Sequence, residues 1–101
     1  PEQVVVAPVT SDFDGYAEEV AKTLNAAGLK AKTDLRNEKI TYKIREHSVS
    51  KIPVIAVVGA KEQENKTVTI RRIGSDKQEV LSLNDLVAKL VEEAKMPHME
   101  E

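Results

Sequence analysis

Several side chains able to bind an anion or a nucleic-acid base lie close together between residues 34 and 48. Arg36, Asn37 and Lys39 follow an alternating segment, and Arg45 belongs to the amphipathic stretch that comes next. Guanidinium and ammonium groups bind phosphate and base oxygens, whereas an asparagine amide both donates and accepts hydrogen bonds. The group therefore predicts binding of a polar, anionic ligand. Helix capping by Asn37, with charges on a solvated helix face, explains the same spacing equally well.

Residues for bond-breaking chemistry are missing or isolated. The chain has no cysteine, which excludes a cysteine nucleophile and a thiolate metal site and suits a reducing compartment such as the cytoplasm. The two histidines are far apart, so we expect no metal site. The glycines stand singly, without a Walker loop or a dinucleotide fingerprint. His47 shares a stripe with Ile40 and Ile44, which predicts a hydrogen-bonded histidine at the core edge. We expect no catalytic residue and no cofactor in this chain.

Charge is unevenly distributed along the sequence. The net charge is −2, from 15 basic and 17 acidic residues. Residues 1–29 and 78–101 each carry −4, whereas residues 30–51 carry +4 and residues 52–77 carry +2. A basic centre between acidic ends is typical of a localised polyanion site, and a solvated charged surface has the same pattern.

Hydrophobic periodicity predicts the strands that position these residues. Continuous apolar runs at Val4–Val9 and Ile52–Val58 indicate two central strands covered on both faces. Alternation over Leu29–Leu35 predicts an edge strand. Residues Thr67–Ile73 and Gln78–Leu81, joined by a glycine-containing turn at 74–77, predict a β-hairpin.

Three helices are expected, over residues 11–27, from 36 or 37 to 49, and from 82 onward. Ser11 and Ser82 are expected to cap the first and the last of them, and Gly28 to close the first in a left-handed conformation. Right-handed crossovers then predict an α/β fold with a mixed five-stranded sheet. Its first three strands are parallel in the order 2-1-3, and the C-terminal hairpin extends the sheet antiparallel. A length of 101 residues suits a single domain over 1–101, and because a strand begins almost directly after Pro1 we expect a fragment of a longer protein. No apolar run is long enough for a membrane span.

The segment from Asp34 to Glu62, DLRNEKITYKIREHSVSKIPVIAVVGAKE, resembles the signature of the anticodon-binding domain of threonyl-tRNA synthetases. The resemblance extends over the whole chain without large gaps. Related domains of prolyl, histidyl and glycyl synthetases share the fold and the strand-glycine pattern at Val58-Gly59, but not the RNEKI and KIREH combination. One departure is Ala60, where bacterial relatives often have Asp.

The resemblance implies a tRNA-binding module without chemistry of its own, monomeric as a fragment. It implies a cytoplasmic, homodimeric threonine–tRNA ligase as the parent chain, with ATP, magnesium and zinc bound in a separate catalytic domain. Arg36 and Tyr42 are expected as secondary tRNA contacts. Tyr42 is the candidate stacking platform, with an ordinary surface tyrosine as the alternative. The residues at anticodon-contacting positions are Asn37, Lys39, Arg45, Lys61, Glu62 and Arg71.

The chemistry of these side chains agrees with such a role. Threonine anticodons have G in the middle and U at the third position, and unstacked bases are recognised along their edges. Glu62 can accept from guanine N1–H and its exocyclic amine, Arg71 can donate to guanine O6 and N7, and Asn37 matches a uracil edge. We expect Glu62 and Arg71 to face the loop of residues 37–39 across the end of the sheet. Phosphates or base oxygens are left to Lys39, Arg45 and Lys61.

Two other readings share the strand and helix order. A flavodoxin-like or receiver-like ligand-binding domain needs a phosphate-binding loop or an acidic pocket after the first strand. The segment Thr10-Ser11-Asp12 resembles such a phosphate-binding loop only weakly. An RNA or protein interaction module can also use the anticodon-binding fold outside a synthetase. A catalytic domain upstream in the same reading frame distinguishes a synthetase from this last class.

Overall fold

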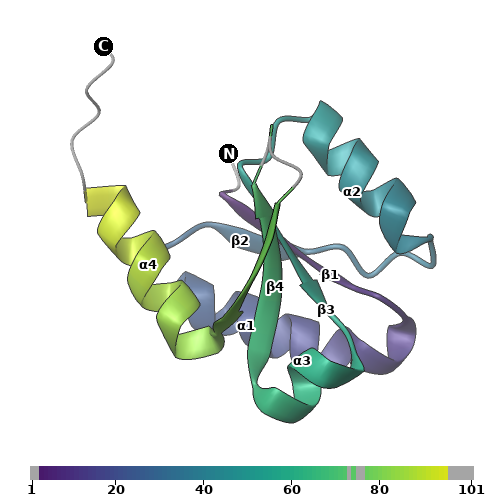
Figure 1. Cartoon of the computed structure of the whole chain (residues 1–101), viewed down its shortest axis with the longest axis horizontal. Helices are drawn as coiled ribbons and strands as arrows, with labels where there is room; N and C mark the ends of the chain where they lie inside the picture. The colour runs from purple at the N-terminus through teal and green to yellow at the C-terminus, as the bar shows by residue number, and fades with distance from the viewer. Residues whose placement is uncertain (1–2, 73, 75–76, 96–101) are drawn as a thin grey trace.

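The structure, a computed structural model, describes residues 3–72, 74 and 77–95, within which the strands form one mixed sheet (Figure 1). The strand order is β2-β1-β3-β4-β5, with β2, β1 and β3 parallel and the last two strands antiparallel. The predicted fold class and order are confirmed. The strands are β1 Val4–Pro8, β2 Ala31–Thr33, β3 Val54–Val58, β4 Thr67–Arg72 and β5 Gln78–Ser82.

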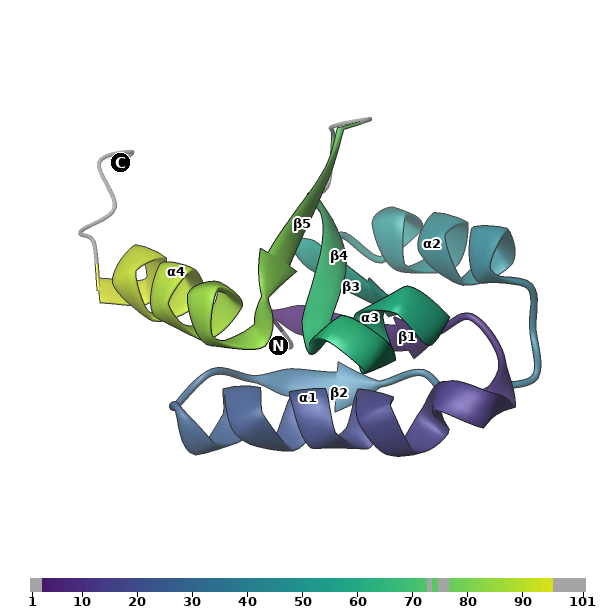
Figure 2. The ribbon, with the colours of Figure 1, turned by 60° about the horizontal axis from the view of Figure 1, so that its bottom comes forward.

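Helices cover the two faces of the sheet unequally. Figure 2 shows α1 and α4 on one side of the sheet and α2 on the other, with the β4–β5 hairpin rising beside α2. A short 3-10 turn, η1, precedes α1. The described residues contain the turn Ser11–Phe13 and four helices: α1 Asp14–Ala26, α2 Ile40–Val49, α3 Ala60–Asn65 and α4 Leu83–Lys95.

The main core lies between the sheet and the α1–α4 layer. Alternate residues of the central strands point into it, and the helices contribute apolar stripes that begin with Tyr16 on α1 and Leu86 on α4. Val5 and Ile55 point to the opposite face and are buried as well. The apolar runs of β1 and β3 are continuous because side chains on both faces of these strands are buried. Beyond α2 the second face is open, and Val80 on β5 is 63% exposed there.

The prediction of three helices is wrong by one. The six-residue α3, Ala60–Asn65, lies in the polar segment between β3 and β4, where the sequence predicts no helix. The Gly59 N–H donates to the Glu62 carboxylate, which satisfies a backbone group at the start of the helix, and Lys66 ends it in a left-handed conformation with φ 56°. A helix of this length has too few turns to show a periodic apolar pattern.

Other boundaries also shift. The helix expected to open at Arg36 or Asn37 begins at Ile40, because Lys39 is extended and residues 34–38 are held in a separate loop. The predicted cap at Ser11 does not form, and η1 precedes α1 instead. The cap at Ser82 is confirmed, since the Asp85 N–H donates to the Ser82 hydroxyl at 3.0 Å. Residues 73, 75 and 76 of the predicted hairpin lie outside the described residues.

None of the helices described by the structure combines the length and apolar character needed to cross a membrane.

Candidate nucleic-acid interface

The loop between β2 and α2 presents two of the predicted contact residues. Its first residue, Asp34, donates its backbone N–H to the Val6 carbonyl at 2.9 Å, and the Glu38 N–H donates to the Arg36 carbonyl at 2.9 Å. Asn37 and Lys39 are exposed, and in the described part of the chain their side chains make no hydrogen bond or ion pair. The loop therefore has an ordered backbone and free side chains at its tip.

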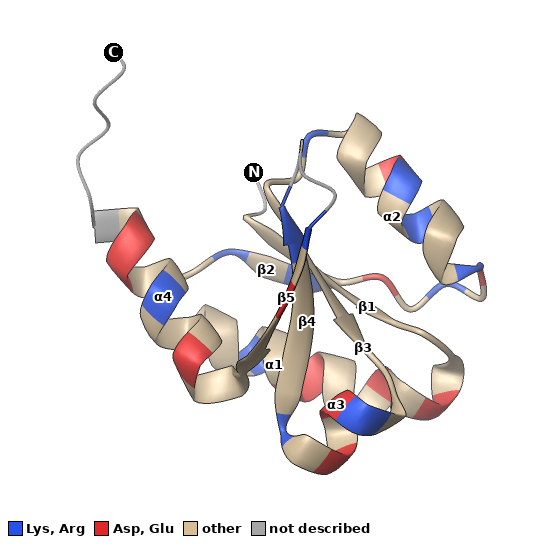
Figure 3. Cartoon of the chain, viewed as in Figure 1, with Lys and Arg blue, Asp and Glu red and all other residues tan. Residues whose placement is uncertain are grey.

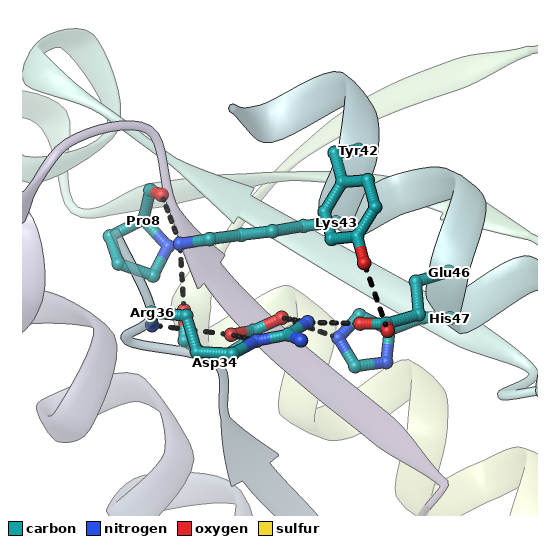
Figure 4. Close-up of polar contacts among 7 residues, drawn as sticks. All are labelled: Pro8, Asp34, Arg36, Tyr42, Lys43, Glu46 and His47. Atoms are coloured by element: carbon teal, nitrogen blue, oxygen red, sulfur yellow. Dashed lines mark hydrogen bonds and ion pairs between the residues drawn. The ribbon is translucent and has the colours of Figure 1, made fainter. Parts of the chain in front are cut away.

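A network of charged groups joins the start of this loop to α2 (Figure 4). The Arg36 guanidinium donates to both oxygens of Asp34, at 2.8 and 2.7 Å, and also bonds Glu46 on α2. The buried His47 ring is 2.7 Å from Asp34 Oδ2. Hydrogen bonds from Arg36 hold the pKa of the Asp34 carboxyl well below its usual range. The hydrogen bond from Arg36 to Glu46 lowers the pKa of Glu46 as well.

This network groups three potential metal ligands that the sequence separates. Atoms of Asp34, Glu46 and His47 lie within 4.8 Å of one another, although no spacing motif joins these residues. The Arg36 guanidinium bonds both carboxylates and so offsets part of their negative charge. The expected hydrogen-bonded histidine at the core edge is confirmed, and within the described residues no hydroxyl or thiol bonds its second nitrogen.

Sequence reasoning missed the role of Lys43, which was counted with the basic surface. Its side chain is only 2% exposed and lies inside the α2 stripe beside Ile40, Ile44 and His47. The ammonium group donates to the Asp34 carbonyl at 2.9 Å and to the Pro8 carbonyl at 3.3 Å (Figure 4). A lysine at the i+3 position from Ile40 is a weak signal of such burial, because surface lysines occur at the same spacing.

The four arginines divide into two paired and two unpaired side chains. Arg36 is bound by Asp34 and Glu46, and Arg72 forms a two-point ion pair with Glu93 at 3.1 and 2.7 Å. Arg45 on α2 and Arg71 on β4 form no hydrogen bond or ion pair among the described residues. The two free arginines are those at predicted anticodon-contacting positions.

The position of Arg71 corrects the expected geometry. In the β3–β4 ladder Arg71 lies opposite Ile55, three residues before the end of β3 at Val58. A strand rises about 3.3 Å per residue, so this is about 10 Å from the carboxyl edge. Arg71 thus lies on the open sheet face beside α2, not at the edge that carries residues 37–39. The hairpin signal located the strand but not its register against β3.

Glu62 and Lys61 lie at the start of α3. The Glu62 carboxylate accepts from the Gly59 N–H at 2.9 Å and from the Thr69 hydroxyl at 2.8 Å, so both oxygens have one partner and further lone pairs remain. Thr69 precedes Arg71 on the same face of β4, which brings Glu62 and Arg71 to a common face. Lys61 is exposed and unpaired in the described part of the chain.

Gly59 allows the start of this helix to approach Val9, the residue after β1. A Cβ at this position would lie 3.2 Å from Val9 Cγ2 and 3.4 Å from Glu62 Oε1. A side chain here would therefore require the Val9 side chain to shift by a few tenths of an ångström.

Tyr42 is 47% exposed on α2. The Arg36 guanidinium lies 5.9 Å from its ring centroid, and its hydroxyl donates to Glu46 at 3.4 Å. The two predicted secondary contacts, Arg36 and Tyr42, are therefore held together by one glutamate.

Figure 3 shows basic segments on α2, on the β2–α2 loop and near the end of β4, while acidic segments predominate on α1 and α4. Blue segments also lie on β2, on α3 and at the start of β4, so the basic residues are spread over several elements.

Comparison with known proteins identifies the family of this chain. Residues 3–93 match the family model described as the anticodon binding domain. The chain belongs to this family. The predicted resemblance is confirmed, and the flavodoxin-like and receiver-like readings are replaced by it.

Relatives of this anticodon binding domain carry a common name. The chain is 59% identical to the threonine–tRNA ligase of Maricaulis maris (strain MCS10), over 98% of this chain and 16% of that protein. It is 60% identical to the threonine–tRNA ligase of Mesorhizobium japonicum, over 96% of this chain and 15% of that protein. The chain thus spans about one sixth of the length of these curated relatives.

Solved structures show the same fold. The RNA binding domain of threonyl-tRNA synthetase from Cryptosporidium parvum Iowa II is similar with a TM-score of 0.90 and 27% identity, over 100% of this chain and 25% of that chain. The histidyl-tRNA synthetase from Nostoc sp. PCC 7120 matches with a TM-score of 0.86 and 21% identity, over 94% of this chain and 23% of that chain. The second likeness concerns the fold alone.

Proposed function

We propose that this domain recognises the anticodon loop of threonine tRNA as one domain of a threonyl-tRNA synthetase. The observation that carries the proposal is a set of exposed or half-exposed polar side chains that no other described residue engages. They occupy the β2–α2 loop, α2, the start of α3 and β4, and they are Asn37, Lys39, Arg45, Lys61 and Arg71. Threonine attachment, with its ATP, magnesium and zinc, belongs to other parts of the parent enzyme in this proposal.

Each group has a chemical task in the proposal. Arg71 donates to guanine O6 and N7, and Glu62 accepts from the guanine N–H groups with its remaining lone pairs. Asn37 pairs with a uracil edge, because its amide offers one donor and one acceptor. The side chains of Lys39, Arg45 and Lys61 bind phosphate or base oxygens. Arg36 and Tyr42 make secondary contacts, with base stacking on the exposed tyrosine ring.

Binding to a threonine anticodon stem-loop is expected to depend on salt. When unpaired cations bind the phosphates of a single-stranded loop, counterions are released, and the logarithm of the binding constant falls with the logarithm of the salt concentration by about 0.7 per contact. The domain offers four such cations: Lys39, Arg45, Lys61 and Arg71. Affinity should therefore fall roughly sevenfold when salt rises from about 0.1 M to about 0.2 M. Titration of a labelled stem-loop at several salt concentrations measures the slope. An affinity that is independent of salt contradicts an interface built from these cations.

Glu62→Gln is expected to keep the fold and weaken discrimination of guanine. Glutamine retains one oxygen for the Gly59 N–H, but its amide offers guanine a donor where the carboxylate offers an acceptor. The preference for G over A at the middle position should fall by about 1 kcal/mol, roughly fivefold. Stem-loop titrations measure this ratio, with Glu64→Gln on the same helix as the control. An unchanged ratio removes Glu62 from base recognition.

A further inference from the structure

The loop that carries Asn37 and Lys39 is anchored at both ends by a single residue of α2. The buried Lys43 ammonium donates to the Asp34 carbonyl at 2.9 Å, where the loop begins. The Lys43 backbone N–H donates to the Lys39 carbonyl at 3.1 Å, where the loop ends. Lys43 thus links the strand end, the loop and the helix.

Burial of this lysine needs a physical explanation. Lysine is rarely buried this completely, because its ammonium group loses hydration. Both hydrogen-bond acceptors recorded for this ammonium are backbone carbonyls, those of Pro8 at the end of β1 and Asp34 after β2. An apolar side chain of similar length would fill the space without this desolvation. The specific effect of the ammonium is to fix these two carbonyls relative to α2.

Asp34 completes the anchor. Its N–H donates to Val6, its carbonyl accepts from Lys43, and its carboxylate accepts from Arg36. The carboxylate also bonds His47. The Arg36 N–H donates to Asp34 Oδ1 at 3.3 Å, so the residue just before Asn37 is fixed as well. Figure 4 shows the contacts of Asp34 with the side chains of Arg36, Lys43 and His47, and Asn37 and Lys39 at the tip of the loop are exposed.

We infer that Lys43 and Asp34 are positioning residues that hold Asn37 and Lys39 in the geometry that binds the anticodon loop, an inference that rests on the proposed function. A loop ordered before binding loses less conformational freedom on binding, and this gain appears as affinity. Neither positioning residue needs to contact RNA, since Lys43 and Asp34 are both buried.

The test uses the 101-residue chain with Lys43→Met, which keeps an unbranched stem and removes the donors. Affinity for a threonine anticodon stem-loop should fall roughly tenfold. Lys22→Met, an exposed and unpaired lysine of α1, is the matched control for lost charge and should change affinity less than twofold. Circular dichroism confirms folding, and Lys43→Gln replaces Lys43→Met if the methionine variant does not fold.

Combining Lys43→Met with other substitutions distinguishes a positioning role of Lys43 from a general loss of stability. In an Asn37→Ala, Lys39→Ala background, Lys43→Met should cause less than a twofold further loss, because the side chains that it positions are gone. In an Arg71→Ala background it should still cause the full tenfold loss. Equal losses in both backgrounds overturn the inference.

Amide hydrogen exchange gives a readout that does not depend on RNA. Lys43→Met should speed exchange at the Asp34 and Glu38 amides while leaving β4 protected. Unchanged exchange in the loop overturns the inference. If the wild-type chain does not prefer a threonine stem-loop over another anticodon, the proposed function fails, and the exchange result still decides whether Lys43 orders the loop.

Discussion

Replacement of Arg71 by alanine is expected to weaken binding of a threonine anticodon stem-loop by about 2 kcal/mol, roughly thirtyfold. The guanidinium is unpaired within the described residues and lies on the open face of β4, so the folded protein does not need it for an internal ion pair. Its fork geometry fits guanine O6 and N7. The loss should therefore be greatest for a loop with G at the middle position. Titrations with G and A stem-loops measure both the affinity and the preference.

Arg72→Ala is the matched control for this experiment. Arg72 is the next residue of the strand, but its guanidinium is bound to Glu93 on α4. Its loss should cost at most about 1 kcal/mol of folding stability and leave the G-over-A ratio unchanged. Arg71 does not recognise the middle base if Arg71→Ala keeps the wild-type G-over-A ratio. The same conclusion holds if Arg72→Ala lowers this ratio as much as Arg71→Ala does.

Asp34→Asn is expected to lower the free energy of unfolding by about 3 kcal/mol. The carboxylate is buried and accepts from Arg36, and it also bonds His47, whereas the asparagine side chain has one acceptor and presents an amide to one of these donors. Urea denaturation of both proteins at neutral pH measures the difference. A loss below about 1 kcal/mol would show that the network adds little to stability.

The same variant should change how stability depends on pH. The pKa of Asp34 is lower in the folded chain than its usual value of 3.8, so the folded state binds fewer protons in acid than the unfolded state. Its contribution is present above about pH 4 and is lost as pH falls further. The pKa of Glu46 is lowered in the same sense, and Lys43 faces Asp34 from α2. Asp34→Asn should make the free energy of unfolding fall less steeply as the pH drops below about 4. Asp12→Asn, at an exposed position, should leave this pH dependence unchanged.

The basic character of the interface could be read from the sequence, but not which cations are free. Lys39 and Lys43 lie four residues apart in one charged segment, yet one is exposed and the other is almost fully buried. Arg71 and Arg72 are neighbours, yet only Arg72 meets a carboxylate. These differences arise from which helix packs against each side of the sheet, and that is a property of long-range contacts.

Local patterns predicted the apolar runs of β1 and β3, the hairpin and the caps at Gly28 and Ser82, and the right-handed crossover rule added the sheet order. These features depend on side-chain alternation, turn residues and backbone conformations that neighbouring residues specify, as the positive φ of 92° at Gly28 illustrates. The tertiary structure decided the Asp34–Arg36–Glu46–His47 network, the burial of Lys43 and the distance of Arg71 from the carboxyl edge. Each depends on strand register or on the packing of α2 across β1, and no short segment of sequence contains that information.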